Sequence, residues 1–115
     1  MSTPGPARGE VWAIDLRDGR GSEQQGSRPA LVVQNDVGNR YAATTIVAVI
    51  TSTIKLYPVT VVLERGEGGL TRRSMVNLSQ IYTIDKGRLG RRLGTLSTDR
   101  MNAVERALKI SLAID

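Results

Sequence analysis

One arginine and two hydroxyl residues stand at the ends of two apolar segments of the sequence. Arg28 lies two residues before the apolar run 30–33, and Thr51 and Ser52 directly follow the run 46–50. A guanidinium offers a planar, bidentate fork to anionic oxygens, and a hydroxyl adds a directional donor. If the two runs are neighbouring strands, the three side chains form an anion pocket suited to a phosphate group.

An RNA phosphodiester is a substrate for which such a pocket would suffice. The 2′-hydroxyl of a nucleotide can attack the neighbouring phosphate, so neither a protein nucleophile nor a metal ion is required. The protein would hold the nucleotide for in-line attack and stabilise the charge on the phosphorane, a task suited to Arg28 and Thr51. The products would be a 2′,3′-cyclic phosphate and a 5′-hydroxyl end.

The same residues also fit a purely structural interpretation. Arg28 could be a surface arginine that pairs with Glu23 or Asp36. Thr51 and Ser52 could be ordinary turn formers. Residue types alone do not decide between this interpretation and the phosphate pocket.

The composition limits the chemistry that is available. The chain of 115 residues contains no histidine and no cysteine, which removes the commonest acid–base group and the thiolate nucleophile. We therefore expect no metal site and no cofactor. The net charge of +5, with ten basic and six acidic residues in 58–115, fits a nucleic acid partner. It equally fits a protein with a moderate surplus of arginine.

Short strands at close spacing must position the candidate residues. Residues 18–27 are predicted as a polar loop, 35–41 as a second loop and 66–69 as a turn. The predicted strands cover residues 9–16, 30–33, 44–50, 59–63, 74–78 and 80–84. This spacing predicts a small barrel rather than a parallel α/β sheet.

The last segment changes to a helical period. Ser97 or Thr98 can cap a helix. At the other end of the chain, residues 1–7 are rich in proline and glycine and are predicted as a disordered leader before a single domain, 8–115. The apolar positions of the helix are Met101, Val104, Leu108 and Leu112. We predict one amphipathic helix that packs on the barrel.

The sequence also bears on where the protein acts. Residues 1–6 lack the basic and apolar regions of a signal peptide. The longest apolar run, 46–50, is far too short to span a bilayer. We therefore expect a cytoplasmic protein without a membrane partner.

Four blocks of the sequence occur in an order shared with a known family. They are G-S-E-Q-Q-G-S-R-P-A-L-V-V-Q-N at 21–35, Q-N-D-V-G-N-R at 34–40, I-V-A-V-I-T at 46–51, and Q-I-Y-T-I-D-K with R-L at 80–89. This pattern resembles the MazF/PemK toxins, the endoribonuclease half of bacterial toxin–antitoxin pairs. The resemblance implies a mainly β fold with α, namely an SH3-like small β-barrel of the plasmid-maintenance-toxin (CcdB-like) type with a C-terminal helix.

The resemblance also implies roles for particular residues. Arg28 and Thr51 match the arginine and threonine that are tied to cleavage in the family. The candidates for RNA binding are Ser22, Glu23, Gln24 and Asn35, which match positions of the family's groove, together with Ser52 beside Thr51. Because an arginine is hard to deprotonate, we assign charge stabilisation to Arg28. Glu23 is our hypothesis for the general base.

The partners are implied by the resemblance as well. A homodimer would bind single-stranded mRNA in a groove and cleave it at short recognition sequences without metal. A MazE-like antitoxin with an acidic tail would block that groove. The alternatives are a CcdB-like toxin, which binds DNA gyrase and cleaves nothing, and an RNA-binding module with a decayed site. The concentration of distinctive residues around Arg28 and Thr51 favours the ribonuclease.

Several further residues have both a functional and a structural interpretation. Trp12 could stack on a base, although a place in the core is favoured. A basic cluster after the last predicted strand could guide RNA or form a solvated face. The cluster is Lys86, Arg88, Arg91 and Arg92. Two tyrosines near the expected site, Tyr41 and Tyr57, could be stacking platforms or packing residues.

Overall fold

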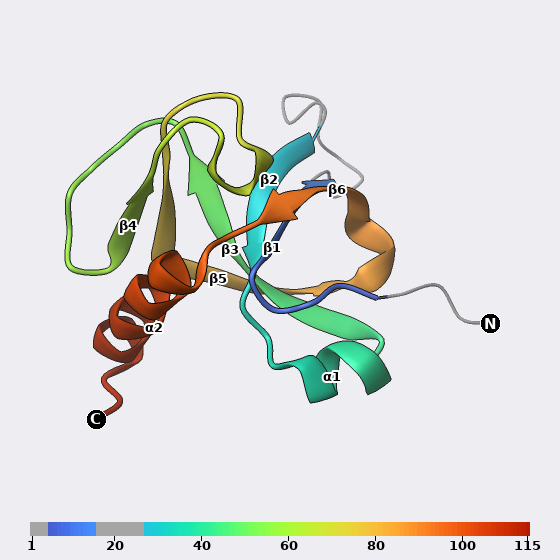
Figure 1. Cartoon of the computed structure of the whole chain (residues 1–115). Coiled ribbons are helices and arrows are strands. Elements are labelled where there is room, and N and C mark those ends of the chain that lie inside the picture. The colour runs from blue at the N-terminus through green and yellow to red at the C-terminus, as the bar shows by residue number, and fades with distance from the viewer. Residues whose placement is uncertain (1–4, 16–26) are drawn as a thin grey trace, which may run out of the picture.

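The computed structural model of the chain describes residues 5–15 and 27–115. Six strands form one sheet that is flanked by two α-helices (Figure 1). The strands are β1 Glu10–Asp15, β2 Ser27–Val32, β3 Thr44–Thr51, β4 Thr60–Leu63, β5 Ser74–Asp85 and β6 Leu89–Thr95. The helices are α1 Asp36–Tyr41 and α2 Thr98–Leu112, with short 3-10 helices η1 Glu67–Gly69 and η2 Lys86–Arg88. In the described part of the chain, no helix has the length and apolar character needed to cross a membrane.

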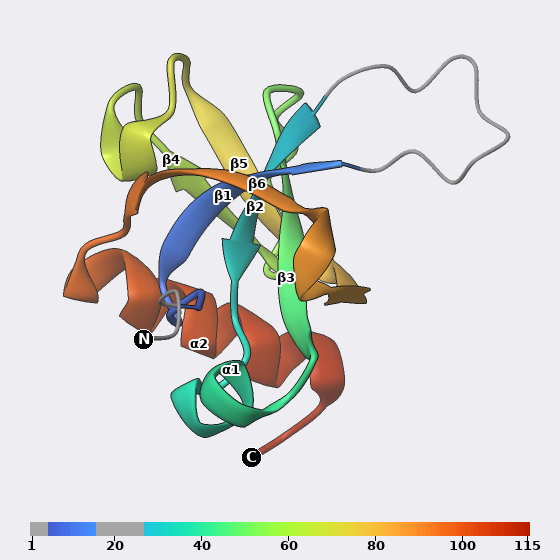
Figure 2. The same ribbon diagram turned by 90° about the vertical axis from the view of Figure 1, so that its right-hand side faces the viewer.

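The sheet is antiparallel throughout, with the strand order β4-β5-β3-β2-β1-β6. β5 is one long strand where two were predicted, and its register against β3 jumps between Ala48 and Val49. The sheet curves around its core (Figure 2). Among the described residues no ladder joins β4 to β6, so the sheet is open and the predicted barrel is a loose description. The predicted mainly β fold with a C-terminal helix is confirmed.

β2 is buried on both faces, as its continuous apolar run predicts. Side chains alternate between the two faces of a strand. Accordingly, Ala30 and Val32 join one apolar cluster, while Leu31 and Val33 join the other. The two clusters hold β2 rigidly in the middle of the molecule, which fixes the position of the residues at its start.

α2 covers the larger of the two apolar clusters. Its N-cap is Ser97, whose hydroxyl oxygen accepts a hydrogen bond from the backbone N–H of Arg100 at 3.2 Å. The side chains of Val104 and Ala107 on α2 are buried against this cluster. Leu112, the last of the apolar positions named for this helix, is 55% exposed. The last turn of α2 extends past the strands and has no sheet to pack against (Figure 1).

Residues 35–41 were predicted as a loop, but they form the N-cap and the six residues of α1. The Asn35 side chain accepts a hydrogen bond from the backbone N–H of Gly38 at 2.8 Å. Asparagine and glycine are typical of turns, which is why the composition concealed the helix. A single helical turn adds little periodicity from which it could be predicted.

A buried asparagine ties α1 to the sheet. The Asn39 side-chain oxygen accepts hydrogen bonds from Gln34 Nε2 at 3.0 Å and from the Thr45 hydroxyl at 2.7 Å. Its amide nitrogen donates to the Gln34 carbonyl at 2.9 Å and to Asp36 Oδ1 at 3.1 Å. Asn39 is only 2% exposed, and all four of its hydrogen-bonding positions are occupied.

β6 was not predicted from the sequence. Its residues, L-G-R-R-L-G-T, contain two glycines and two arginines, which hide the strand alternation. The predicted basic cluster is therefore wrong in one respect: Arg91 and Arg92 do not follow the last strand but belong to it. β6 is an edge strand, where charged side chains are common.

The backbone of η1 lies directly against β6. Gly69 has a left-handed φ of 76°, and a Cβ atom there would stand 1.9 Å from the Leu93 carbonyl oxygen. A Cβ atom on Gly94 would stand 2.5 Å from the Gly68 carbonyl carbon. Only glycine permits this close approach of two chain segments.

We expect an ion pair between η1 and α2 to make stability depend on pH. Arg100 donates to both carboxylate oxygens of Glu67, at 2.8 and 2.9 Å. These bonds hold the pKa of Glu67 below its usual value of 4.5, although burial opposes the shift. Glu67→Gln should lower the free energy of unfolding by about 1 kcal/mol at pH 7.

That difference should disappear in acid. Because the folded-state pKa of Glu67 is lowered, its stabilisation is complete above the unfolded-state pKa and is lost as the pH falls through the folded-state pKa. Urea denaturation at pH 7 and at about pH 3 measures both values. Glu64→Gln is the control, since its ion pair with Arg73 is exposed. An equal effect of Glu67→Gln at both pH values would contradict the prediction.

Candidate active site

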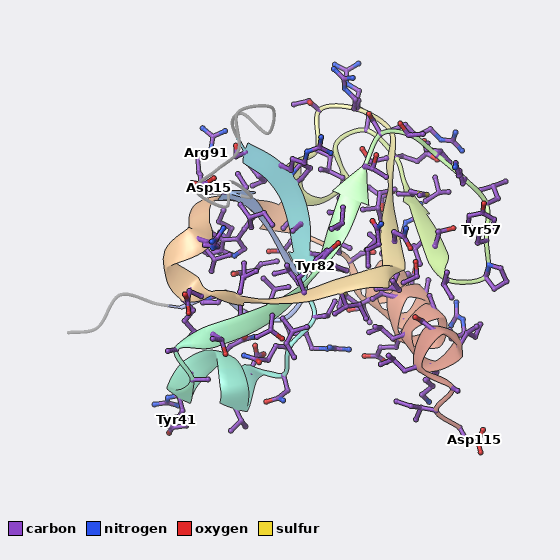
Figure 3. The ribbon with its side chains drawn as sticks, turned by 180° about the vertical axis from the view of Figure 1, so that it is seen from behind. Asp15, Tyr41, Tyr57, Tyr82, Arg91 and Asp115 are labelled. Atoms are coloured by element: carbon purple, nitrogen blue, oxygen red, sulfur yellow. The ribbon has the colours of Figure 1, made fainter. Side chains whose placement is uncertain are left out.

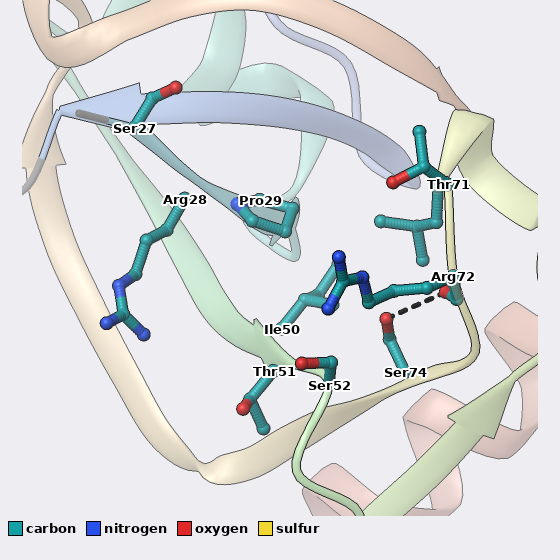
Figure 4. A pocket seen from close by; sticks show the side chains of 10 residues that line it. Ser27, Arg28, Pro29, Ile50, Thr51, Ser52, Thr71, Arg72 and Ser74 are labelled. Atoms are coloured by element: carbon teal, nitrogen blue, oxygen red, sulfur yellow. Dashed lines mark hydrogen bonds between the residues drawn. The ribbon is translucent and has the colours of Figure 1, made fainter.

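The predicted juxtaposition of Arg28 with Thr51 is present in the fold. β2 and β3 are antiparallel neighbours, and Ala30 lies opposite Val49. The beginning of β2 therefore lies beside the end of β3. Arg28 and Thr51 both line a pocket of about 390 Å³ at this edge of the sheet, together with Ser52 (Figure 4).

A third segment completes the pocket, between η1 and the first residue of β5. In Figure 4 the side chain of Arg72 extends from this segment toward Ile50 and Ser52, whereas that of Arg28 lies on the opposite side and extends away from Arg72. The full lining is Ser27, Arg28 and Pro29 from β2, Ile50, Thr51 and Ser52 from the end of β3, and Leu70, Thr71, Arg72 and Ser74. Its polar groups are therefore guanidinium and hydroxyl groups.

The pocket is cationic and has no internal counter-ion. No aspartate or glutamate is among its described lining residues. Within residues 5–15 and 27–115, the guanidinium of Arg28 has no hydrogen bond or ion pair. The suggested pairing with Asp36 is absent, because that carboxylate accepts from the backbone N–H of Arg8 at 2.7 Å and from Asn39. The other suggested partner, Glu23, lies outside the described residues.

Two carboxylates near the strands, those of Asp36 and Glu10, accept hydrogen bonds from other protein groups. The hydrogen bond from the backbone N–H of Arg8, assisted by Asn39, lowers the pKa of Asp36. For Glu10, burial alone would raise the pKa, but hydrogen bonds from Ala7, Trp12 and Arg92 lower it overall. Both groups are therefore anionic at neutral pH and occupied by protein donors.

The hydroxyls of the site have defined partners. Thr51 Oγ1 accepts a hydrogen bond from the backbone N–H of Thr53 at 3.1 Å, which leaves its own proton available for donation. Thr51 thus shapes the turn and keeps a donor for an anion. The Ser74 hydroxyl donates to the Arg72 carbonyl at 2.9 Å, which fixes the backbone of Arg72 (Figure 4).

A second pocket, of about 250 Å³, adjoins the first. The two share Ser27, Arg28, Pro29, Leu70 and Thr71. Residues that line only the second pocket are Ala13, Gly69, Arg91 and Leu93. Arg28 therefore lines both adjoining pockets, and each pocket has one further arginine, Arg72 in the first and Arg91 in the second.

Comparison with known proteins identifies the family. Residues 7–112 match the PemK-like, MazF-like toxin of type II toxin–antitoxin systems. The chain belongs to this family. The endoribonuclease EndoA of Bacillus subtilis (strain 168) is 46% identical to this MazF-like toxin over 109 residues, which are 93% of this chain and 94% of the relative.

Solved structures agree with this assignment. An endoribonuclease in complex with its cognate antitoxin, from a mycobacterial species, superposes with a TM-score of 0.82 at 31% identity, over 96% of this chain and 97% of that one. MazF from Deinococcus radiodurans gives a TM-score of 0.76 at 25% identity, over 95% and 97%. The predicted resemblance is confirmed, and the gyrase-binding alternative is not favoured by these matches.

Some residues predicted for the site of this MazF-like toxin lie elsewhere. Asn35 is seven residues from Arg28, at the opposite end of β2, where it caps α1. Ser22, Glu23 and Gln24 lie outside the described residues. The RNA-binding roles of these four residues stay predictions.

The aromatic candidates also lie away from the pocket. Trp12 packs against the cluster around Ile14, and its indole N–H donates to Glu10 at 2.9 Å, which favours the core interpretation. Tyr41 ends α1, and Tyr57 lies between β3 and β4 on the other side of the molecule (Figure 3). Neither tyrosine lines the pockets. A stacking role for either tyrosine stays a prediction.

Sequence reasoning missed Thr71, Arg72 and Ser74. They form part of a polar run, T-R-R-S, just before β5. Nothing in that run distinguishes the pocket arginine from Arg73, which faces Glu64. Only the path of the chain from η1 to β5 shows that this segment closes the pocket.

Proposed function

We propose that this toxin is an endoribonuclease that cleaves single-stranded mRNA at short recognition sequences without a metal ion or cofactor. The observation that carries the proposal is the pocket in which Arg28 and Thr51 lie together, with no acidic residue among its described lining residues. The name of the Bacillus relative, an endoribonuclease 46% identical to this chain, supports the activity.

The residues of the pocket suit a transfer of the phosphoryl group within the RNA. The 2′-oxygen attacks the phosphorus while the bond from phosphorus to the 5′-oxygen breaks. The proton of the 2′-hydroxyl passes to a base, and the 5′-oxygen gains a proton. Arg28 offers its fork to the non-bridging oxygens, whose charge grows in the transition state, and the Thr51 hydroxyl donates a hydrogen bond to one of them. The products are a 2′,3′-cyclic phosphate and a 5′-hydroxyl.

Glu23 is proposed as the base that accepts the 2′-hydroxyl proton. Glu23→Gln should lower single-turnover cleavage by about 10²-fold, the usual worth of general base catalysis. It should also flatten the acidic limb of the pH–rate profile, since glutamine does not titrate. Measurement of cleavage between pH 4 and 9 checks both effects. Full cleavage by the variant across this range would assign the proton transfer to another group.

The remaining proposals concern partners and setting. A homodimer of domain 8–115, preceded by the leader 1–7, would place a groove for RNA beside each pocket. Ser22, Gln24, Asn35 and Ser52 would contact that RNA. A MazE-like antitoxin would inhibit the toxin in the cytoplasm, and the net charge of +5 suits both an RNA and an acidic antitoxin tail. The antitoxin complex of the mycobacterial relative supports this partner.

The experiment that tests the function is cleavage of a long single-stranded RNA in EDTA, followed by mapping of the ends. We expect cuts at a repeated short sequence, with cyclic-phosphate and 5′-hydroxyl ends. The Arg28→Ala protein, purified in the same way, controls for contaminating ribonuclease. An RNA left intact by folded, antitoxin-free protein would refute the proposed activity.

A further inference from the structure

Arg72 lines the same pocket as Arg28 and forms no ion pair with the residues that the structure describes. The next residue, Arg73, donates to Glu64 at 3.3 Å, whereas Arg72 has no hydrogen bond or ion pair from its guanidinium to any residue in the described ranges. The Ser74 hydroxyl fixes the Arg72 backbone, and the side chain extends into the pocket (Figure 4). Arg72 is thus placed to meet an anion that the described residues do not provide.

On β6, too, one arginine of an adjacent pair forms an ion pair and the other, Arg91, does not do so with the described residues. Its neighbour Arg92 donates to Glu10 at 3.0 Å. Successive side chains of a strand point to opposite faces, so one arginine is neutralised and the other is not. Arg91 lines the adjoining pocket and has no partner among the residues that the structure describes.

The two adjoining pockets together form a cleft whose positive charge suits more than one anionic group. Three guanidiniums, from β2, from the segment before β5 and from β6, border it, and its described lining includes no carboxylate. Like charges repel one another across such short distances, and bound anions would relieve that repulsion. A chain of linked phosphates supplies several anionic groups at regular spacing.

We propose that the cleft binds two consecutive phosphates of the RNA backbone. Arg72 acts together with Arg28 on the scissile phosphate, and Arg91 holds a phosphate next to it. The inference rests on the proposed ribonuclease function and adds two residues and a minimal substrate to it. Two cations on the scissile phosphate share the charge of the phosphorane, and the contact with the neighbouring phosphate fixes the strand for in-line attack.

The role of Arg72 is tested by cleavage of an oligonucleotide centred on a mapped cut site. Arg72→Ala should lower the single-turnover rate constant by about 100-fold, as expected for loss of one transition-state donor. Arg73→Ala removes the same charge one residue away and should cleave within about twofold of wild type, because surface ion pairs contribute little. Equal rates for these two variants would overturn the assignment of Arg72.

The role of Arg91 is tested by binding to a 2′-O-methyl version of that oligonucleotide, which cannot be cleaved. Arg91→Ala should weaken binding about tenfold, the worth of one charged hydrogen bond. It should also reduce the slope of log K against log salt by about 0.7, the value for one phosphate on a single strand. Arg106→Ala, an exposed change on α2, controls for net charge.

A neutral methylphosphonate at one of the two linkages beside the cut supplies the matching change in the substrate. At the linkage that Arg91 contacts, this replacement should weaken wild-type binding about tenfold and should not weaken Arg91→Ala further. Additive losses at both linkages would overturn the contact. Wild-type cleavage with no effect of either arginine would refute this inference alone, whereas absence of wild-type cleavage would refute the ribonuclease function.

Discussion

Replacing Arg28 with alanine should lower the single-turnover rate constant for RNA cleavage by roughly 10³- to 10⁵-fold, the range for arginines that stabilise a transferring phosphoryl group. The loss should be large because Arg28 offers a bidentate fork in a pocket whose described lining residues include no carboxylate. The side chain is exposed, so the fold should not depend on it. Rapid-quench cleavage of a short oligonucleotide, beside urea denaturation, measures both quantities.

Two further variants separate charge from geometry at this position. Arg28→Lys keeps the charge but loses the planar fork, and should recover only part of the rate. Thr51→Ala removes one neutral donor and should cost about 10²-fold, less than Arg28→Ala. Wild-type rates in both Arg28→Ala and Thr51→Ala would show that the reaction takes place elsewhere on the protein.

Replacing Asn39 with alanine should lower the free energy of unfolding by about 3 kcal/mol. The variant leaves the Thr45 hydroxyl, which is fully buried, without its partner, and it removes one of the two acceptors of Gln34 Nε2, which keeps its bond to the Thr44 carbonyl. Each unsatisfied buried group costs roughly 1–3 kcal/mol. Urea denaturation followed by the fluorescence of Trp12 measures the change.

The control for this prediction is Asn102→Ala. Asn102 is an exposed residue of α2, and its replacement should change stability by less than about 0.5 kcal/mol. Thr45→Val removes only one of the four hydrogen bonds of Asn39 and should fall between the two. Unfolding of Asn39→Ala at the wild-type urea concentration would mean that the amide network is not what anchors α1.

These two predictions divide the sequence blocks of the family into different kinds of residue. Arg28 and Thr51 line a pocket, and the Arg28 guanidinium has no bond to the described residues, although Thr51 also shapes a turn. In the block Q-N-D-V-G-N-R, by contrast, Gln34, Asn35 and Asn39 are occupied by hydrogen bonds that build α1. A residue shared with a family can therefore be kept by the fold rather than by the reaction.

The fold could be predicted where burial controlled the residue pattern. The apolar runs of β2 and β3 revealed strands buried in the centre, and the period after Ser97 revealed α2. The pattern failed at β6, an edge strand with two glycines, and at α1, which is a single turn held by side-chain amides. In both places, tertiary contacts rather than local preference determine the structure.

The site could be predicted only in part for the same reason. Arg28 and Thr51 are recoverable because each marks the end of an apolar strand. Arg72 and Arg91 each stand beside another arginine, and only the position of Glu64 and Glu10 in space shows which member of each pair is neutralised. That information is absent from local sequence.

The contact between η1 and β6 has a consequence for how this toxin can diverge. Gly68 and Gly69 touch Leu93 and Gly94 through backbone atoms, so the spacing between the wall that carries Arg72 and the wall that carries Arg91 does not depend on side chains. Exchanges at the residues that line the cleft can therefore alter which RNA is accepted without moving the scaffold. Point substitutions in the cleft can thus change the RNA sequence that is cleaved, while the contacts of Gly68, Gly69 and Gly94 keep the backbone in place.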